Sequence, residues 1–274
     1  MPPRRCLILL VAVILVQSAR AESTPVSVHI IDIAAPAGVE ASSMQWAKIE
    51  TVNSGTMLAA VARPQGKGPF PAVLIVHGSH GFAREYLALV GELASHELIA
   101  VAACWFQGGI PGNESVSAPI DCPQAGPIPM GPSAAARSTI TDLVAAVRML
   151  PGVRPDRIAL FGHSRGAGAT INYLEHGGAA RAAVLNSSGY PDEYIAAATQ
   201  IHASVFVLHG MKDTNADFTR FERAQQFAEA LRAAKVPLQT QFYPEGVHSG
   251  MFSDRRQHDD EVARIVKFLR EELR

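Results

Sequence analysis

Short runs of consecutive apolar residues alternate with longer segments of helical periodicity, and this alternation limits the folds available to the chain. The run 72–76 is Ala-Val-Leu-Ile-Val, a pattern typical of a strand buried on both faces. A second buried strand is predicted at 98–103, and further strands at 157–161, 182–185, 205–208 and 238–242. Helices are predicted at 85–95, 133–150, 166–175, 218–234 and 261–273. Strands that alternate with helices indicate an α/β fold with a mostly parallel central sheet and helices on both faces.

The N-terminal part of the domain has a different pattern. A weak strand is expected at 26–33, and two β-type stretches within 47–62 flank Asn53-Ser54-Gly55, which predicts a hairpin turn. We find no internal repeat and no linker-like segment after residue 21. The sequence therefore predicts a single domain over residues 22–274.

The first 21 residues have the three regions of a secretory signal peptide. Arg4 and Arg5 precede the unbroken apolar run 7–16, and Ala19 and Ala21 form an A-x-A cleavage site. The alternative, a membrane anchor, requires about 20 apolar residues. We therefore expect cleavage after Ala21, a secreted or periplasmic protein, and no stable membrane span after cleavage.

Charge and cysteine content exclude several classes of protein. The chain has 24 Lys+Arg against 25 Asp+Glu, a formal net charge of -1, and no basic cluster, which argues against a nucleic-acid partner. Three cysteines are too few for a Cys₄ zinc site, and we predict no metal site. Cys6 leaves with the signal peptide. In an oxidising compartment Cys104 and Cys122 can form a disulfide, and the alternative is two unrelated thiols.

Residues 105–133 are rich in Gly and Pro and fit no regular element. A long loop in a compact domain is usually functional or disordered. This loop follows a predicted parallel strand, and ligands bind at the carboxyl ends of such strands. We expect it to form a wall or lid of the substrate pocket, with Trp105 and Phe106 as candidate pocket walls. Two Asn-x-Ser sequons, at Asn113 and Asn186, matter only in a host that glycosylates.

The strongest motif is Gly162-His163-Ser164-Arg165-Gly166, a G-x-S-x-G sequence. A predicted strand enters it and a predicted helix leaves it, which is the context of a nucleophile elbow. Such a turn lifts the serine hydroxyl above the sheet at a helix N-terminus, where the helix dipole favours developing negative charge. The alternative is a serine N-cap in an ordinary turn between strand and helix. The context favours Ser164 as a nucleophile.

A serine hydroxyl needs an adjacent base, which a third group orients. Asp213 follows the predicted strand 205–208, and His248 follows the predicted strand 238–242. Both positions are expected at the same sheet edge as Ser164. The sequence thus predicts a catalytic triad of Ser164, Asp213 and His248.

Rival residues fit the triad less well. Asp217 has the position of a helix N-cap. His77, His163 and His209 each end a buried strand, and we expect them to pack or to hydrogen-bond locally. His258 is expected at the start of a solvated helix.

An oxyanion hole on such an elbow combines two backbone N–H groups. One belongs to the residue after the nucleophile, Arg165. The other is expected from the loop His77-Gly78-Ser79-His80-Gly81, and we select Ser79. The side chains of Arg165 and Ser79 need no catalytic role in this interpretation. The loop is alternatively a simple turn or a phosphate cradle, but no nucleotide-binding motif accompanies it.

The order of these motifs resembles the α/β-hydrolase fold, and more narrowly the dienelactone-hydrolase family. The resemblance covers roughly residues 46–273 and rests on Arg63-Pro64, 68–71, 77–81, 162–166, 209–213 and 243–248. The family implies the triad of Ser164, Asp213 and His248 and no cofactor. Its namesake enzymes carry a cysteine nucleophile where this chain has Ser164, which points towards serine carboxylesterases and polyester-cleaving relatives.

The predicted function is hydrolysis of small or polymeric carboxylic esters through an acyl-enzyme on Ser164. One alternative is a peptidase or an acyltransferase with the same triad, although peptidases of this fold often carry an added domain. Another is a non-catalytic binding member of the family. The intact set of three groups favours the enzyme, since a binding module has no physical need for all of them.

Overall fold

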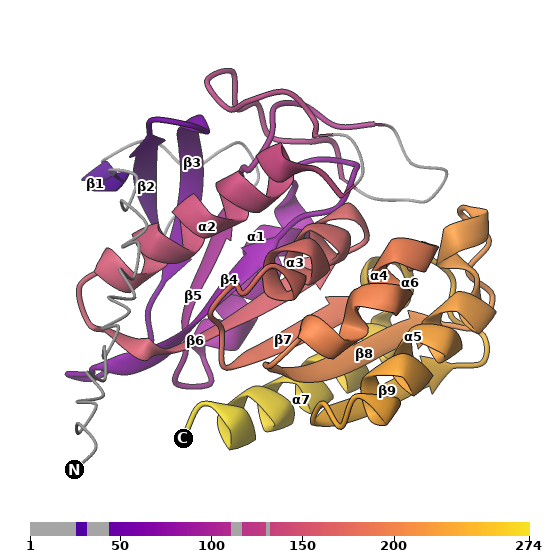
Figure 1. Ribbon diagram of the computed structural model, residues 1–274. Helices are drawn as coiled ribbons and strands as arrows, with labels where there is room; N and C mark the ends of the chain where they lie inside the picture. Colours follow the sequence, from indigo (N-terminus) through magenta and orange to yellow (C-terminus); the bar gives the residue numbers. More distant parts are fainter. Residues whose placement is uncertain (1–25, 32–43, 111–116, 130–131) are drawn as a thin grey trace, which may run out of the picture.

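A computed structural model describes residues 26–31, 44–110, 117–129 and 132–274 (Figure 1). The predicted signal peptide, residues 1–21, and the sequon at Asn113 lie outside the described residues. Within the described ranges the chain forms one nine-stranded sheet in the order β1-β2-β3-β5-β4-β6-β7-β8-β9. The sheet is mostly parallel and is flanked by helices, so the predicted α/β architecture is confirmed.

The N-terminal edge of the sheet is antiparallel. Strand β1 (Val26–Ile31) pairs with β2 (Met44–Thr51), and β2 pairs with β3 (Gly55–Ala62). The predicted hairpin turn lies between β2 and β3, and Gly55 has a φ of +74°, which favours glycine. Strand β3 joins the rest of the sheet through antiparallel pairing with β5 (Ile99–Ala103).

The remaining neighbours in the sheet pair in parallel. They are β5, β4 (Phe70–Val76), β6 (Val153–His163), β7 (Ala182–Asn186), β8 (Ser204–Gly210) and β9 (Leu238–Tyr243). Their carboxyl ends share one edge of the sheet, which is where open α/β sheets bind ligands.

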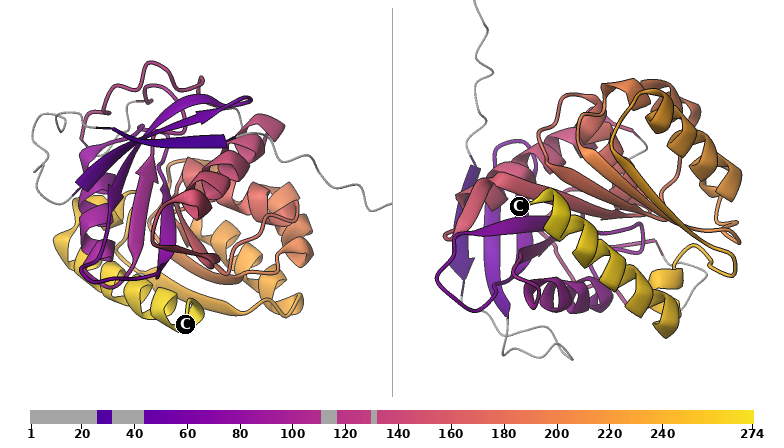
Figure 2. Two further views of the ribbon diagram at one scale, coloured as in Figure 1. Left: turned by 90° about the vertical axis from the view of Figure 1, so that its left-hand side faces the viewer. Right: turned by 90° about the horizontal axis from the view of Figure 1, so that it is seen from below.

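Helices cover both faces of the sheet (Figure 2). One apolar cluster packs the sheet against α1 (Arg84–Ala94) and α7 (Arg255–Glu272). The other packs it against α2 (Ala134–Met149), α3 (Arg165–Glu175), α4 (Asp192–Ala197) and α5 (Phe221–Ala233). The short elements are the 3₁₀ turns η2 (Ala198–Gln200) and η3 (Asp217–Thr219) and the helix α6 (Gly250–Ser253). None of the helices in the described ranges combines the length and apolar character needed to cross a membrane.

Three of the predicted elements have clearly different bounds in the structure. Strand β6 begins at Val153 because the polar segment 154–157 continues the strand along a partly exposed path. Helix α7 begins at Arg255, since the Asp254 side chain accepts hydrogen bonds from the backbone N–H groups of Arg256 and Gln257. This side-chain cap extends a polar first turn. The helix predicted at 218–234 is divided into η3 and α5.

The long loop after β5 has no helix or named strand in its described residues. A disulfide joins Cys104, at the end of β5, to Cys122 within the loop. Both cysteines are buried. Backbone hydrogen bonds from Ile120 to Phe82 and from Gln107 to Gly126 hold the loop further. The disulfide thus ties the loop to the carboxyl edge of the sheet.

Candidate active site

Ser164 occupies a sharp turn between β6 and α3. Its backbone has φ +52° and ψ −117°, a conformation that costs about 1–3 kcal/mol for a residue with a side chain. The flanking glycines are required by close packing, because a Cβ atom would lie 2.0 Å from Val76 O at Gly166 and 2.5 Å from Ala167 Cα at Gly162. Gly168 differs from these two glycines, because a Cβ there would make an ordinary 3.5 Å contact with Tyr194.

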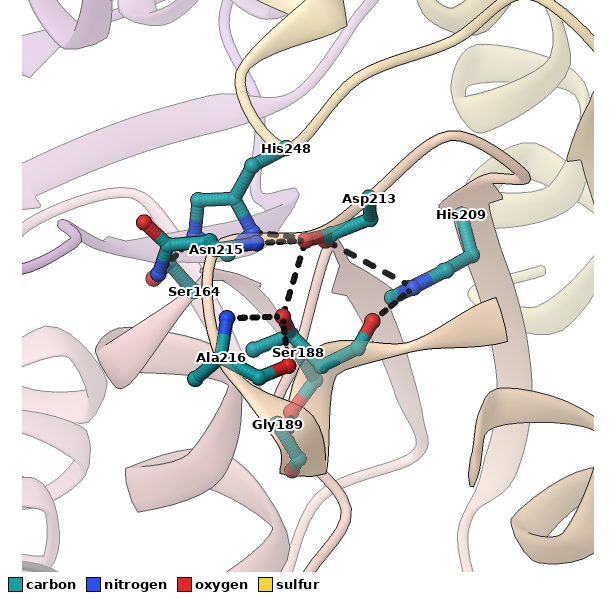
Figure 3. Close-up of polar contacts among 9 residues, drawn as sticks. Ser164, Ser188, Gly189, His209, Asp213, Asn215, Ala216 and His248 are labelled. Atoms are coloured by element: carbon teal, nitrogen blue, oxygen red, sulfur yellow. Dashed lines mark hydrogen bonds and ion pairs between the residues drawn. The ribbon is translucent and has the colours of Figure 1, made fainter. Parts of the chain in front are cut away.

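Ser164, His248 and Asp213 form a continuous hydrogen-bonded chain (Figure 3). The Nδ1 of His248 lies 2.6 Å from Asp213 Oδ2, and its Nε2 lies 2.8 Å from Ser164 Oγ. A carboxylate only accepts, so His248 Nδ1–H donates to Asp213. This tautomer leaves His248 Nε2 free to accept the Ser164 hydroxyl proton. The structure therefore brings together the three residues that the sequence analysis selected.

The carboxylate of Asp213 is fully buried and satisfied by its neighbours. Asp213 Oδ1 accepts hydrogen bonds from the backbone N–H of Asn215 at 3.1 Å and from Thr219 Oγ1 at 2.8 Å. Buried charges are tolerated when they are hydrogen-bonded in this way. These contacts also hold the oxygen Oδ2 towards His248. The loop after β8 thus presents Asp213 in one orientation (Figure 3).

His209 lies on the other side of Asp213. Its Nε2 donates to the Thr219 carbonyl at 2.7 Å and lies 3.5 Å from Asp213 Oδ2. Burial lowers the pKa of His209, although the nearby Asp213 carboxylate opposes the shift. A neutral His209 that supports the Asp213 loop agrees with the local packing role expected for it.

The loop 77–81 and Ser164 approach closely. A Cβ atom at Gly78 would lie 3.3 Å from Ser164 Cβ, so the glycine permits the approach. Among the described residues, the backbone N–H groups of Ser79 and Arg165 have no hydrogen-bond acceptor. Two free N–H donors beside the serine have the composition of an oxyanion hole.

Two histidines hold this loop from within the core. His77 Nδ1–H donates to Gly78 O at 3.0 Å, while its Nε2 accepts from the Trp105 N–H at 3.3 Å. Tyr86 accepts from Gly78 N–H and donates to His163 Nδ1 at 2.8 Å. Burial lowers the pKa of His77 to about 3 and holds the pKa of His163 well below its usual range. Both rings are therefore neutral structural groups, as expected.

Trp105 and Phe106 do not form open pocket walls as expected. Their side chains are 3% and 0% exposed and belong to the core. Both rings pack against His77, with centroid distances of 5.8 and 4.5 Å, and Trp105 Nε1 donates to His77 O at 3.0 Å. The two aromatic residues thus support the loop 77–81 from the core through their contacts with His77.

The other candidate residues have separate places in the structure. Asp217 is exposed and pairs with Arg220. Asn186 is buried, and its side-chain amide donates to Glu261, so the sequon at Asn186 is covered in the folded chain. His258 lies in the polar first turn of α7, as expected, and is half-buried there. Its Nε2 is 3.0 Å from both carboxylate oxygens of Glu92, which raises the pKa of His258.

Several residues that support the site have no signal in the sequence. They are Thr219, Tyr86, Asn186 and Glu261. Asn186 is an example: its carbonyl accepts the Ser164 N–H at 2.9 Å, yet no spacing in the sequence relates the two. In the described ranges, no group of three or more His, Cys, Asp or Glu side chains is arranged to hold a metal ion.

A comparison with family sequences identifies the family of the chain. The sequence profile of the dienelactone hydrolase family matches residues 57–270, a span that includes Ser164, Asp213 and His248. The chain belongs to the dienelactone hydrolase family. No curated protein matches the sequence of this family member.

Solved structures of related fold extend the comparison. A dienelactone hydrolase-like promiscuous phosphotriesterase from metagenomic libraries superposes with a TM-score of 0.68 at 19% identity, covering 85% of this chain and 100% of that chain. Acetyl xylan esterase 1 from Thermoanaerobacterium gives a TM-score of 0.60 at 14% identity, covering 91% and 89%. Dipeptidyl peptidase 4 from Porphyromonas gingivalis gives a TM-score of 0.65 at 18% identity, and the match covers 84% of this chain and 35% of the peptidase. These similarities identify the α/β-hydrolase fold.

Proposed function

We propose that this family member is a serine hydrolase that cleaves carboxylic esters through an acyl-enzyme intermediate. The observation that carries the proposal is the continuous contact from Ser164 Oγ through the His248 ring to the Asp213 carboxylate. Membership of a hydrolase family supports esterase-type activity in general. A serine, a neutral imidazole and a buried carboxylate in this order are the components that activate a hydroxyl for attack on a carbonyl.

In the first half of the reaction, Ser164 Oγ attacks the ester carbonyl carbon while His248 Nε2 accepts the hydroxyl proton. The carbonyl oxygen becomes an oxyanion. Collapse of this intermediate breaks the bond to the alcohol oxygen, to which His248 returns the proton. In the second half, His248 takes a proton from water, the hydroxide attacks the acyl carbon, and Ser164 leaves with the proton from His248.

The surrounding groups stabilise the charges that develop. The N–H groups of Ser79 and Arg165 are suited to receive the oxyanion, and loss of one such donor typically lowers kcat by about 100- to 1,000-fold. Asp213 orients the His248 ring and stabilises the imidazolium that forms transiently. The substrate class is a small or polymeric ester. A serine nucleophile favours carboxylic esters other than the dienelactone that the cysteine enzymes cleave.

A fluorophosphonate probe tests the proposal directly. The wild-type protein should be labelled on Ser164 and should hydrolyse p-nitrophenyl acetate, whereas Ser164→Ala should retain the fold and lose both properties. Ser188→Ala is a matched control, because Ser188 is also buried near the site and its Oγ contacts only Gly189 O among the described residues. Substantial turnover by Ser164→Ala would contradict the assignment.

The same assay separates the alternatives. An acyltransferase would transfer the acyl group to an added alcohol in preference to water, and a peptidase would cleave amide substrates faster than matched esters. A folded wild-type protein that neither reacts with the probe nor turns over esters would instead favour a binding module.

We also propose a secreted or periplasmic location. The proposal rests on the predicted signal peptide and is supported by the Cys104–Cys122 disulfide, because disulfides persist in oxidising compartments. Mass spectrometry of the mature protein should find an N-terminus at Glu22. Recovery of the full-length chain from the cytoplasm would contradict this location.

A further inference from the structure

The side chain of Arg165 spans the two strand-end loops beside Ser164. Its Nε donates to Ser79 Oγ at 2.9 Å, and its Nη1 donates to the carbonyl of Pro129 at 2.6 Å. The guanidinium therefore connects the nucleophile turn, the loop 77–81 and the long loop after β5. Three segments that are distant in the sequence meet on this one side chain.

The partners of Arg165 are neutral oxygens. No carboxylate in the described residues forms an ion pair with it, and partial burial lowers the pKa of Arg165. A half-buried guanidinium without an acidic partner adds little stability as an ion pair, because taking the charge out of water is costly. Its planar fork of donors is, however, well suited to hold two acceptors in defined positions.

The two residues joined by this contact are the ones selected for the oxyanion hole, and neither backbone N–H has an acceptor among the described residues. The Ser79 carbonyl also accepts the Ile110 N–H at 2.7 Å, so the residue is held by both its carbonyl and its hydroxyl. Contacts on both its carbonyl and its side chain limit the backbone dihedral angles of Ser79 and, with them, the direction of its N–H. Arg165 then positions the second donor of the hole relative to the first.

We propose that Arg165 is a positioning residue that sets the geometry of the oxyanion hole through the Ser79 hydroxyl. The inference deepens the proposed function and rests on it. In the described residues the hydrogen bonds of the Arg165 side chain go to Ser79 Oγ and Pro129 O, and not to Ser164 Oγ or His248. Arg165 acts through the position of the Ser79 N–H. This N–H binds the oxyanion of the transition state more strongly than the carbonyl of the bound substrate, so a change in its position affects kcat more than KM.

The test uses Arg165→Ala, Ser79→Ala and the double variant, all of which retain both backbone N–H groups. Misplacement of a catalytic group by about 1 Å can cost about 100-fold, so we expect Arg165→Ala to lower kcat by about 10- to 100-fold with KM changed less than about twofold. Ser79→Ala should give a similar loss. The double variant should be no slower than Arg165→Ala, since non-additivity identifies residues that act through one contact.

Two further measurements separate positioning from general stability. Arg148 is a matched control, because it is also half-buried and its guanidinium donates to backbone carbonyls of Pro155 and Ala179. Arg148→Ala should lower the melting temperature without changing kcat. A trifluoromethyl ketone, which mimics the tetrahedral oxyanion, should bind Arg165→Ala more weakly in proportion to the loss of kcat/KM.

The outcomes distinguish the inference from the function on which it rests. If the wild-type protein neither hydrolyses esters nor reacts with the fluorophosphonate, the proposed function fails. If the wild type is active and Arg165→Ala keeps kcat within about twofold, or if the losses of the two single variants multiply in the double variant, the positioning role is overturned and the esterase assignment stands.

Discussion

The Nε2 atom of His248 lies 2.8 Å from the Oγ atom of Ser164, although the two residues are 84 positions apart in the chain. Ser164 follows β6, and His248 follows β9, which lies at the far edge of the sheet. Their loops meet because the carboxyl ends of the parallel strands lie on the same side of the sheet. The strand end before Asp213 and the loop before His248 also lie close together. A Cβ atom at Gly210 would lie only 2.3 Å from Gly246 O.

Substitution of Asp213 by Asn should abolish most activity while preserving the fold. An amide at this position can donate to His248 Nδ1, which stabilises the tautomer with the proton on Nε2. In that tautomer Nε2 can no longer accept the proton of Ser164. In triads of this type such a change lowers kcat by about 10⁴. Steady-state kinetics with p-nitrophenyl acetate measures the effect. Asp217→Asn, at the exposed rival position, should retain wild-type kcat, and equal losses in the two variants would contradict the role of Asp213.

Two glycines near Ser164 should respond oppositely to Ala. Gly166→Ala would place a Cβ 2.0 Å from Val76 O, so the turn must shift, and overpacking of this kind typically costs about 1–3 kcal/mol. Gly168→Ala has room in α3 and should raise the free energy of unfolding by about 0.5–1 kcal/mol through helix propensity. Urea denaturation followed by circular dichroism measures both. Equal stability of the two variants would show that the approach of α3 to β4 is not constrained.

Loss of the disulfide should destabilise the loop after β5. It closes a segment with a sequence separation of 18, and removal of a native disulfide typically costs about 2–5 kcal/mol. We expect Cys104→Ser/Cys122→Ser to unfold at lower temperature and to be cleaved faster by protease within the loop. The matched control is the wild-type protein treated with dithiothreitol, which should reproduce the double variant. A variant with unchanged melting temperature and protease resistance would contradict this role.

The buried carboxyl of Glu261 should make stability pH-dependent. Burial raises the pKa of Glu261 in the folded state to about 8, whereas its ordinary pKa is near 4.5. Above pH 4.5 the unfolded state has released this proton, and the folded state still binds it. Between these values the folded state binds more protons, and the free energy of unfolding therefore decreases as pH rises. Glu261→Gln should flatten this decrease and be the more stable protein at pH 9.

The matched control is Glu271→Gln, an exposed position on the same helix. Its pH profile of stability should follow that of the wild type. Chemical denaturation at a series of pH values gives the comparison. A Glu261→Gln profile parallel to the wild-type profile would show that Glu261 is not the titrating group.

The sequence by itself determined the alternation of strands and helices and the position of the nucleophile turn. Apolar runs such as 72–76 and the glycines around Ser164 report local backbone conformation, because burial and steric freedom depend on the nearby chain. The chain order of Ser164, Asp213 and His248 then predicted which strand ends carry the candidate triad. The polar first turn of α7 escaped prediction because a side-chain cap, and not an apolar stripe, begins that helix.

Only the tertiary structure decided which side chains meet. Arg165 with Ser79, Asn186 with Glu261, and His258 with Glu92 come from elements that are distant in the sequence, and their contacts depend on the sheet order and on which face each helix covers. Trp105 and Phe106 have the composition of pocket walls, but in the folded chain both are buried against His77. The physical reason is that local patterns encode conformation and burial, whereas partners are set by long-range packing.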